Sequence, residues 1–526
     1  RQPPITSMKT TRRTALKLLS SVAPALLLNR RLRAQSGLEI QPGPFQGTRA
    51  SLQYYEIPEW FRDAKFGIWA HWGPQSSVEQ GDWYARNMYM QGSRQNQYHL
   101  ATYGHPSKFG YKDLVPLWKA AEFDPEHLMG LYRRAGARYF MSMGVHHDNF
   151  DLWNSRHTRW NAVQMGPRRD VVGLWEKAAR RQGLRFGVSE HLWISYKWFG
   201  VSHGSDHTGP LAGVAYDGVD PRHADLYHDA GSAQWAGGKF SWNADHIPDA
   251  WRHHWFLRIK DLVDQYQPDL LYTDGALPFE EVGCSAVANL YNLSARRHGG
   301  ATQAVYTSKR PEDCAVGTCV LDFERGLANA IRPEPWQTDT CIGEWHYRRG
   351  IQYKSTKTVI DLLVDIVSQN GNLMLNFPLP NSGRLDPDEM QVLDGITAWM
   401  AVNSEGIHAT RPWKIFGEGP AAAAPTPGAG FNEKARRALT VADVRFTTRG
   451  NTLYAFLMGW PAQAGSEAVI KALGTASPQK PARVVHVTLL GHGGRLPFTQ
   501  EAAGLRVRLP AEQPSEHAIA LKITLA

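Results

Sequence analysis

Four apolar stretches of this 526-residue chain end in side chains that can exchange protons or bind hydroxyl groups. Histidine ends the first stretch, two histidines and an aspartate end the second, and a carboxylate ends each of the other two. If these stretches are parallel strands of a barrel, their carboxyl ends meet at one mouth. The four endings are Ile68-Trp69-Ala70-His71, Val145-His146-His147-Asp148, Leu270-Leu271-Tyr272-Thr273-Asp274 and Leu321-Asp322-Phe323-Glu324.

Asp274 and Glu324 are the candidates for catalysis, because two carboxylates can flank one glycosidic bond. A glycosidase that retains the anomeric configuration needs them about 5 Å apart, one as the nucleophile and the other as the acid and base. Each residue also has a purely structural interpretation. An aspartate after a strand often caps a helix, and Glu324 could form only a salt bridge with Arg325.

The pair His146-His147, followed by Asp148, also suggests a metal-dependent hydrolase. Adjacent strand residues point to opposite faces, so both histidines reach one ion only if the strand has already ended. The first stretch contains no H-x-H pattern that would add ligands. The sequence therefore predicts no metal and no organic cofactor. A metal-assisted barrel hydrolase and a non-catalytic carbohydrate-binding protein are the alternatives.

Short β-rich runs alternate with amphipathic helical stretches from residue 60 to about residue 400. Asp124-Pro125 is a typical helix start, and Gly183 follows the end of another helical stretch. Repeated β-then-α favours an α/β fold, a (β/α)8 TIM-like barrel, within residues 37–410. Predicted strands cover residues 65–71, 139–145, 184–189, 270–274, 304–308, 320–324 and 373–377, and predicted helices cover 124–134, 170–182, 250–265, 357–368 and 387–401.

The pattern changes around Trp413, and residues 419–430 have the Ala-, Pro- and Gly-rich composition of a linker. Only β-type runs follow, so we expect residues 411–526 to form a C-terminal antiparallel β-sandwich that supports the barrel. Within the barrel, residues 190–249 show little periodicity. We expect this long loop to form part of a substrate groove. The β-type runs are residues 439–447, 452–458, 483–490, 505–509 and 518–525.

The N-terminal residues 1–36 are basic and resemble an export signal. Eight of the 58 basic residues lie there with no acidic one, so the remainder has 50 basic and 49 acidic residues and no excess charge for binding nucleic acid. The segment Thr11-Arg12-Arg13-Thr14-Ala15-Leu16-Lys17 resembles a twin-arginine pattern, and an apolar stretch and Ala34 follow it. We therefore expect a periplasmic or secreted enzyme that has no membrane partner.

The four cysteines, Cys284, Cys314, Cys319 and Cys341, fit no C-x-x-C metal pattern. A disulfide between Cys314 and Cys319 and buried free thiols are both compatible with their spacing. No C-x-P-x-R segment surrounds any of them, so a sulfatase-type modified cysteine is not indicated.

Several motifs resemble the α-L-fucosidases of glycoside hydrolase family 29, in the family's order, between about residue 55 and residue 415. The resemblance implies a retaining exo-glycosidase that forms a covalent glycosyl-enzyme intermediate. Its partner would be a fucosylated oligosaccharide or polysaccharide. The motifs are Ala64-Lys65-Phe66-Gly67-Ile68-Trp69-Ala70-His71-Trp72-Gly73, the stretch from His146 to Trp153, Trp160-Asn161, Gly166-Pro167-Arg168-Arg169-Asp170 and Asn370-Gly371-Asn372-Leu373-Met374-Leu375-Asn376.

The same resemblance implies roles for individual residues. Asp274 occupies the position of the family's nucleophile, and spacing favours Glu324 as the acid/base, with Glu344 as the alternative. A donor such as Arg310 would keep the pKa of Asp274 low, whereas Glu324 must first carry a proton. The positions implied to bind the sugar are His71, Asp82, Trp83, His146, His147, Tyr272, Arg310 and Trp345.

Two departures from the family pattern bear on the substrate. Asp82 stands where glutamate is common. After Phe186-Gly187, where the family often has tyrosine and serine, the run here is Val188-Ser189-Glu190-His191. We expect Glu190 and His191 to add an acid and an imidazole to the pocket. They would suit fucose in an unusual linkage, a substituted fucose or L-galactose. The sequence does not indicate the aglycone or the oligomeric state.

Overall fold

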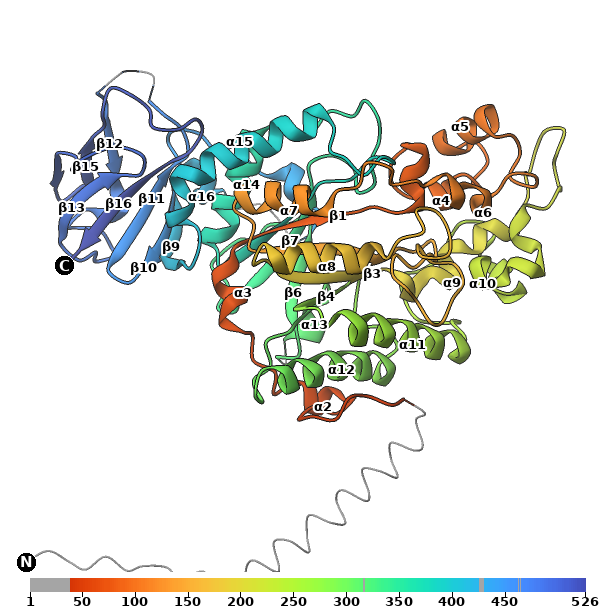
Figure 1. Ribbon diagram of the computed structural model, residues 1–526. Helices are drawn as coiled ribbons and strands as arrows, with labels where there is room; N and C mark the ends of the chain where they lie inside the picture. Colours follow the sequence, from red (N-terminus) through yellow and green to blue (C-terminus); the bar gives the residue numbers. More distant parts are fainter. Residues whose placement is uncertain (1–37, 316, 425–429, 462, 464) are drawn as a thin grey trace, which may run out of the picture.

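The computed structural model describes residues 38–526 apart from positions 316, 425–429, 462 and 464, so the predicted signal segment lies outside the described residues. Eight parallel strands form a closed barrel in which each strand pairs with the next and β8 pairs with β1 (Figure 1). The predicted fold class is therefore confirmed. The strands are β1 Phe66–Ala70, β2 Tyr139–Val145, β3 Arg185–Glu190, β4 Leu270–Thr273, β5 Val305–Ser308, β6 Val320–Glu324, β7 Trp336–Cys341 and β8 Gly371–Asn376.

Strand β7 is the barrel strand that apolar patterning does not predict. Its sequence Trp336-Gln337-Thr338-Asp339-Thr340-Cys341 has four consecutive polar residues, yet every position is buried. The polar side chains find partners inside the barrel: Gln337 donates to Asp322 at 2.7 Å, and Asp339 accepts from the hydroxyl of Tyr272 at 2.7 Å. Paired in this way, polar groups can replace the apolar side chains of an ordinary barrel strand.

Helices cover the outside of the barrel and begin where the sequence supplies caps. Asp124 caps α7 by accepting from the backbone N–H of His127 at 3.0 Å, and Asp386 and Glu389 form a capping box on α15. Among the described residues, no helix is both long enough and apolar enough to cross a bilayer. The barrel helices are α2 Arg49–Leu52, α3 Glu59–Ala64, α7 Pro125–Arg134, α8 Val171–Arg181, α11 Asp249–Tyr266, α12 Glu281–Arg297, α13 Pro311–Cys314, α14 Thr356–Ser368 and α15 Pro387–Asn403.

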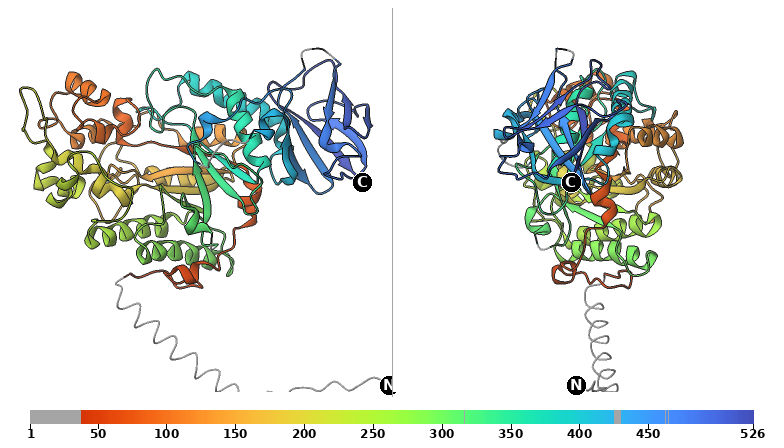
Figure 2. Two further views of the ribbon diagram at one scale, coloured as in Figure 1. Left: turned by 180° about the vertical axis from the view of Figure 1, so that it is seen from behind. Right: turned by 90° about the vertical axis from the view of Figure 1, so that its left-hand side faces the viewer.

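The long connections after β1 and β3 pack against each other, at the end of the molecule away from the C-terminal strands (Figures 1 and 2). Asp217 joins them because its carboxylate accepts from the hydroxyls of Tyr89 and Tyr227, each at 2.7 Å. This packing gives the long loop after β3 a fixed shape beside the barrel mouth. The short helices of the two connections are α4 Tyr84–Asn87, α5 Arg94–Thr102 and α6 Tyr111–Leu114 after β1, and α9 Ser195–Trp198 and α10 Ala224–Tyr227 after β3.

The C-terminal strands form two antiparallel sheets around their own apolar core. The larger sheet has the order β13-β16-β11-β10-β9 and the smaller one β12-β15-β14. Strands β9, β12 and β14 were not predicted from the sequence, because they are short or only partly buried. The strands are β9 Arg411–Glu418, β10 Val444–Arg449, β11 Thr452–Leu457, β12 Glu467–Ile470, β13 Val484–Leu489, β14 Phe498–Gln500, β15 Leu505–Arg508 and β16 Ile519–Leu525, with the short helix α16 Pro420–Ala423 after β9.

Between β9 and β10 the chain comes back to the barrel, at a stretch that we call the return segment (residues 430–435). Its Phe431 N–H donates to the carbonyl of Glu324 at 2.7 Å, and its Glu433 N–H donates to the carbonyl of Arg325 at 3.0 Å. The side chain of Asn432 also accepts from the backbone N–H of Leu327 at 2.9 Å. The return segment thus holds the chain at the end of β6.

Charged residues join the sandwich to the barrel. Asp365 of α14 is buried, with Arg436 at 3.1 Å and with Arg445 of β10 in direct contact. Two guanidinium groups around one carboxylate hold the pKa of Asp365 below its usual value, although burial opposes them. The pairing offsets the cost of burying these charges at the contact between the two domains.

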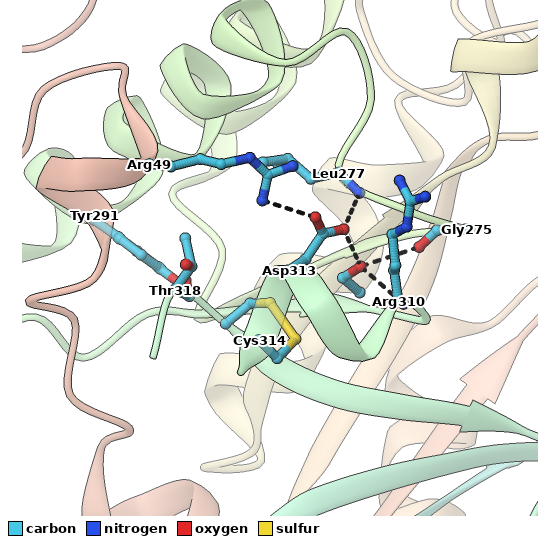
Figure 3. The surroundings of a disulfide bond; sticks show 10 residues. Arg49, Gly275, Leu277, Tyr291, Arg310, Asp313, Cys314 and Thr318 are labelled. Carbon is cyan, nitrogen blue, oxygen red and sulfur yellow. Dashed lines mark hydrogen bonds and ion pairs between the residues drawn. A yellow bond between two sulfur atoms is a disulfide. The ribbon is translucent and has the colours of Figure 1, made fainter. Parts of the chain in front are cut away.

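Cys314 and Cys319 form a disulfide, one of the two outcomes compatible with their spacing, whereas Cys284 and Cys341 are buried free thiols. Figure 3 shows the disulfide beside Asp313, which accepts from the backbone N–H of Leu277 at 2.7 Å and pairs with Arg49 at 2.8 Å. These contacts fix the segment after β4 against the segment after β5.

Candidate active site

A cavity of about 460 Å³ lies at the carboxyl ends of the barrel strands. Ten of the thirteen predicted site residues line it, and the other three, Glu190, Arg310 and Glu344, do not. The lining residues are Trp69, His71, Asp82, Trp83, His146, His147, His191, Trp193, Trp242, Tyr272, Asp274, Gly275, Ala276, Lys309, Glu324, Asp339, Trp345 and Phe431.

Asp274 follows β4 and is surrounded by groups that favour its charge. Its Oδ1 lies 2.8 Å from Nζ of Lys309, and its Oδ2 lies 3.3 Å from a ring nitrogen of both His147 and His191. Burial alone would raise the pKa of Asp274, but the positive charge of Lys309 and the contacts with His191 and His147 outweigh it and hold the pKa well below the usual range. The carboxylate is therefore ionised, as a nucleophile must be.

Glu324 ends β6 and lies on the other side of the same ammonium group. It contacts Lys309 Nζ directly, so the nearest oxygens of Glu324 and Asp274 are at most about 5 Å apart, the separation in retaining glycosidases. Burial raises the pKa of Glu324, and the negative charges of Asp339 and Asp274 add to this against the opposing effect of Lys309. The environment therefore favours a protonated Glu324 beside an ionised Asp274.

Lys309, not Arg310, is the cation of the site, which corrects the prediction for Arg310. Strand β5 ends at Ser308, so Lys309 is the first residue past the strand and faces the cavity. Arg310, the next residue, turns away. Its side chain is 61% exposed and lies 3.5 Å from Glu312. The resemblance located the basic residue one position too late.

Glu190 is not a pocket residue, whereas its neighbour His191 is. Glu190 is buried, and it accepts from the indole N–H of Trp255 and the backbone N–H of Leu192, each at 2.9 Å. Burial raises the pKa of Glu190 to about 7. Because strand residues alternate in direction, Glu190 faces helix α11 and His191 faces Asp274.

Glu344 also lies outside the cavity lining, and it pairs with Arg348 at 2.9 Å. Asp82 does line the cavity, and its Oδ1 lies 2.6 Å from Nδ1 of His346. The prediction that Asp82 contributes to the pocket therefore agrees with its position.

His71 and His146 are neutral rings, and their free Nε2 atoms have opposite hydrogen-bonding roles. Asn376 Oδ1 accepts from the backbone N–H of His71 at 2.8 Å, so it also accepts from Nδ1 of His71 at 3.2 Å, which leaves Nε2 as an acceptor. Gln75 uses its oxygen for the N–H of Ala85, so its amide donates to Nδ1 of His146 at 2.9 Å, which leaves Nε2 as a donor. Burial, with neighbouring histidines, lowers the pKa of both rings well below the usual value. One donor and one acceptor therefore face a ligand.

Among the described residues, histidines and carboxylates in or beside the cavity come close enough in three groups to hold a metal ion. Burial lowers the pKa of His191 to about 4 in spite of Asp274, so this ring is neutral and could act as a ligand. The Nδ1 atom of His147 already has a hydrogen-bond partner, because it lies 2.6 Å from the carbonyl oxygen of His191. The groups are His71, His146 and His191; Asp82, His146 and His346; and His147, His191 and Asp274.

Aromatic rings form the walls of the cavity. Trp345 lies with its ring centre 5.0 Å from that of His71 and 5.7 Å from that of Trp69, and Trp83 lies 6.1 Å from His147. These rings give flat apolar faces beside the polar nitrogens. A sugar ring, with C–H groups on its faces and hydroxyls on its edge, fits such a lining.

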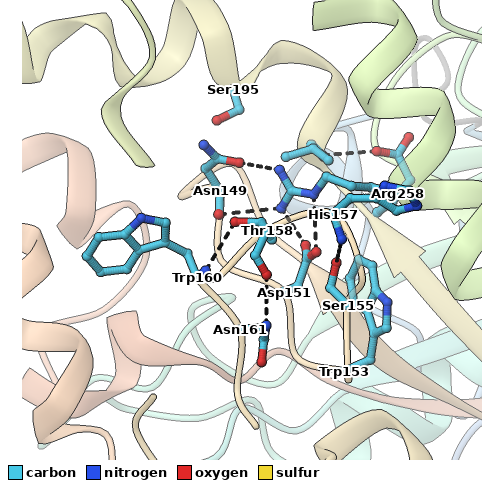
Figure 4. Close-up of polar contacts among 12 residues, drawn as sticks. Asn149, Asp151, Trp153, Ser155, His157, Thr158, Trp160, Asn161, Ser195 and Arg258 are labelled. Atoms are coloured by element: carbon cyan, nitrogen blue, oxygen red, sulfur yellow. Dashed lines mark hydrogen bonds and ion pairs between the residues drawn. The ribbon is translucent and has the colours of Figure 1, made fainter. Parts of the chain in front are cut away.

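A buried ion pair supports the segment that carries His146 and His147. Arg258 of α11 is fully buried, contacts Asn149 and lies 3.1 Å from Asp151 through Nε (Figure 4). Asn149 has a φ of +63°, so the chain turns sharply directly after the histidines. Arg258 thus fixes the turn that points the two histidines into the cavity.

Sequence reasoning missed several residues of the lining. Lys309 could have been found as the first residue after a predicted strand. Trp193 and Trp242 belong to the long loop of residues 190–249, which was expected to form part of the groove, but no local pattern singled out these two residues. Phe431 gave no signal, because only the tertiary fold brings its segment to the mouth. Asp339 was missed together with its strand β7.

A parallel barrel with two carboxylates at most about 5 Å apart at its mouth, whose pKa values shift in opposite directions, is the arrangement expected of a retaining glycoside hydrolase. Comparison with known proteins agrees. The sequence model described as α-L-fucosidase matches residues 32–405, and the model of the α-L-fucosidase C-terminal domain matches residues 438–524. The chain belongs to the α-L-fucosidase family. The predicted family and the predicted enzyme class are therefore confirmed.

Individual relatives span nearly the whole chain. The tissue α-L-fucosidase of Rattus norvegicus is 26% identical over 522 residues, which is 96% of this chain and 97% of the relative. The plasma α-L-fucosidase of the same organism is 28% identical over 503 residues, covering 93% and 94%. The solved structure of Thermotoga maritima α-fucosidase in complex with fucose aligns with a TM-score of 0.67 and 24% identity, covering 91% of this chain and all of that one.

Proposed function

We propose that this enzyme hydrolyses terminal α-L-fucosyl residues with retention of configuration, with Asp274 as the nucleophile and Glu324 as the acid/base. The observation that carries the proposal is that Lys309 touches both carboxylates while their pKa values move in opposite directions. These opposite directions favour one charged and one protonated acid, the pair of states that the reaction requires.

In the first step the Asp274 carboxylate attacks the anomeric carbon and forms a glycosyl ester, while Glu324 gives its proton to the leaving oxygen. Negative charge disappears from Asp274 and appears on Glu324. Because Lys309 contacts both groups, it stays beside the charge throughout this transfer. The ammonium group therefore needs little rearrangement as the bond breaks.

In the second step the Glu324 carboxylate takes a proton from water, and the resulting hydroxide cleaves the ester. Asp274 is uncharged while it is esterified, so one of the charges that raise the pKa of Glu324 is absent. The pKa of Glu324 therefore falls between the two steps, and the same side chain changes from acid to base. Cleavage of the ester restores both starting states.

The neutral histidines would bind the sugar hydroxyls. His71 Nε2 accepts a hydrogen bond, and His146 Nε2 donates one. Trp83 and Trp345 would pack against the faces of the ring. Asp82 is engaged with His346, so this pair would recognise a hydroxyl together. The added His191 favours substituted fucose or L-galactose as further substrates within fucosylated oligosaccharides or polysaccharides.

We also propose that the enzyme is exported to the periplasm or secreted through the twin-arginine pattern in residues 1–36. The disulfide between Cys314 and Cys319 supports this proposal, because such bonds persist in oxidising compartments. Fractionation of cells that express the full chain tests it. Enzyme found only in the cytosol would contradict export.

Trapping with a 2-deoxy-2-fluoro-α-L-fucosyl donor, followed by peptide mapping, tests the role of Asp274. We expect the label on Asp274, and we expect Asp274→Asn to fold but to lose nearly all turnover. A label elsewhere would remove Asp274 from the mechanism.

Leaving-group dependence tests the role of Glu324. Glu324→Gln should slow poor leaving groups by about 10²–10⁴-fold, and activated aryl fucosides much less. The matched control is Glu344→Gln, which changes an acid outside the cavity. Equal losses on both substrates in Glu324→Gln, or the selective loss in Glu344→Gln instead, would transfer the role to Glu344.

A further inference from the structure

Exposed aromatic side chains are concentrated at the mouth of the catalytic cavity. Among the exposed large hydrophobic side chains of the described residues, three are aromatic: Tyr54, Trp242 and Phe431. Two of these three, Trp242 and Phe431, line this same cavity, where they are 51% and 70% exposed. Large exposed apolar faces beside a binding site indicate a surface that a ligand covers.

Trp242 belongs to the long loop after β3 and is held by its neighbours. Its ring centre lies 5.2 Å from that of Phe240, 5.9 Å from that of Trp83 and 6.5 Å from that of Trp193. The adjacent Asn243 accepts from Lys197 Nζ at 2.8 Å. The indole is thus packed against three other aromatic rings, while half of its surface stays exposed at the mouth.

Phe431 comes from the return segment, far from Trp242 in the sequence. Its backbone N–H donates to the carbonyl of Glu324 at 2.7 Å, so the ring is attached next to the proposed acid/base. The oxygen that Glu324 protonates belongs to the leaving group. A leaving group within reach of Glu324 therefore lies beside Phe431.

The side of the cavity next to the nucleophile is kept open by small residues. Gly275 and Ala276 follow Asp274 and line the cavity. A Cβ atom on Gly275 would lie 3.2 Å from Trp193, whose indole donates to the carbonyl of Asp274 at 2.7 Å. These small residues leave room for the sugar beside the nucleophile, so the leaving group lies on the opposite side, towards Glu324 and Phe431.

From this arrangement we propose that Trp242 and Phe431 form a leaving-group subsite for a neutral pyranose. The inference rests on the proposed function, because the subsite is defined by the bond between Asp274 and Glu324. The two rings carry no charge and offer apolar faces with negative potential, which suit the C–H face of a pyranose and disfavour an anionic group. The two residues thus determine which aglycones are accepted.

Two substrates separate this inference from the proposed function. α-L-Fucosyl fluoride has a leaving group with no ring, whereas a panel of α-1,2-, α-1,3-, α-1,4- and α-1,6-linked fucosyl disaccharides places a neutral pyranose in the subsite. For Trp242→Ala and for Phe431→Ala, we expect the ratio of kcat/KM for the preferred disaccharide to kcat/KM for the fluoride to fall about tenfold, as for the loss of one stacking contact. Tyr54→Ala, the third exposed aromatic residue, is the matched control and should leave both constants unchanged.

The outcomes are distinct. Wild-type enzyme that does not hydrolyse the fluoride refutes the proposed function, and the subsite with it. Wild-type enzyme that hydrolyses the fluoride but no disaccharide overturns the subsite alone. An unchanged ratio in both variants also overturns it. Activity on the fluoride reports that each variant is folded, and a loss confined to one variant assigns the subsite to that residue.

Discussion

Replacement of Lys309 by methionine is expected to move the whole pH profile of kcat/KM to higher pH. Lys309 is the largest influence that lowers the pKa of Asp274, so its removal raises this pKa and the acidic limb moves up. Lys309 also lowers the pKa of Glu324, so its removal raises that pKa further and the basic limb moves up as well. Both limbs therefore move in the same direction.

The size of the effect follows from the contact distance. A unit charge 2.8 Å from Asp274 contributes about 6 kcal/mol at an effective dielectric constant of about 20. Removing one partner of a buried ion pair generally costs about 3–5 kcal/mol. His147 and His191 still face Asp274, so we expect the lower end of this energy range, about 3 kcal/mol. Since about 1.4 kcal/mol changes the ionised fraction tenfold, kcat/KM on the acidic limb should fall about a hundredfold.

The assay is hydrolysis of an aryl α-L-fucoside across the pH range over which wild-type enzyme stays folded. Arg310→Met is the matched control, because it removes the neighbouring cation, which lies outside the cavity, and it should leave the profile in place. Limbs that move in opposite directions would refute the electrostatic account of Lys309. So would a uniform loss of rate in which neither limb moves.

Three further predictions follow from other parts of the structure. Dialysis against EDTA should leave activity unchanged, and a loss that Zn²⁺ restores would favour the metal-assisted alternative instead. Replacing both Cys314 and Cys319 by serine should lower the free energy of unfolding by about 2 kcal/mol in urea titrations, because the disulfide closes a short loop; equal midpoints would contradict this. Gly275→Ala should lower kcat/KM about tenfold or more, because its Cβ would crowd Trp193 at a φ of +120°; wild-type kinetics would show that Trp193 need not stay in place.

The sequence predicts well those features that one strand and its end determine. Asp274 and Glu324 each follow or end an apolar run, and the carboxyl ends of parallel barrel strands lie at one mouth whatever the details of packing. Closure of the barrel therefore brings them together, as the structure shows. His71, His146 and His147 were identified on the same grounds.

Features that depend on direction or on tertiary packing were less predictable. Neighbouring residues at a strand end face opposite ways, so an error of one position changes which side chain is expected in the cavity. Lys309 lines the cavity and Arg310 does not, and His191 lines it and Glu190 does not. Strand β7 was not predicted because its residues are mostly polar, and they are buried only because side chains on other strands form hydrogen bonds with them. Trp242 and Phe431 lie in irregular segments whose positions no local pattern determines.

The route of the chain has a consequence for how such a protein can change in evolution. After β9 the polypeptide leaves the sandwich, attaches residues 430–435 to the end of β6, and only then completes the sandwich with β10. The two domains are therefore interleaved along the gene. A recombination event that exchanged everything after residue 410 would also exchange the return segment, which binds the backbone of Glu324 and carries Phe431. A new C-terminal region would therefore change the aglycone preference as well.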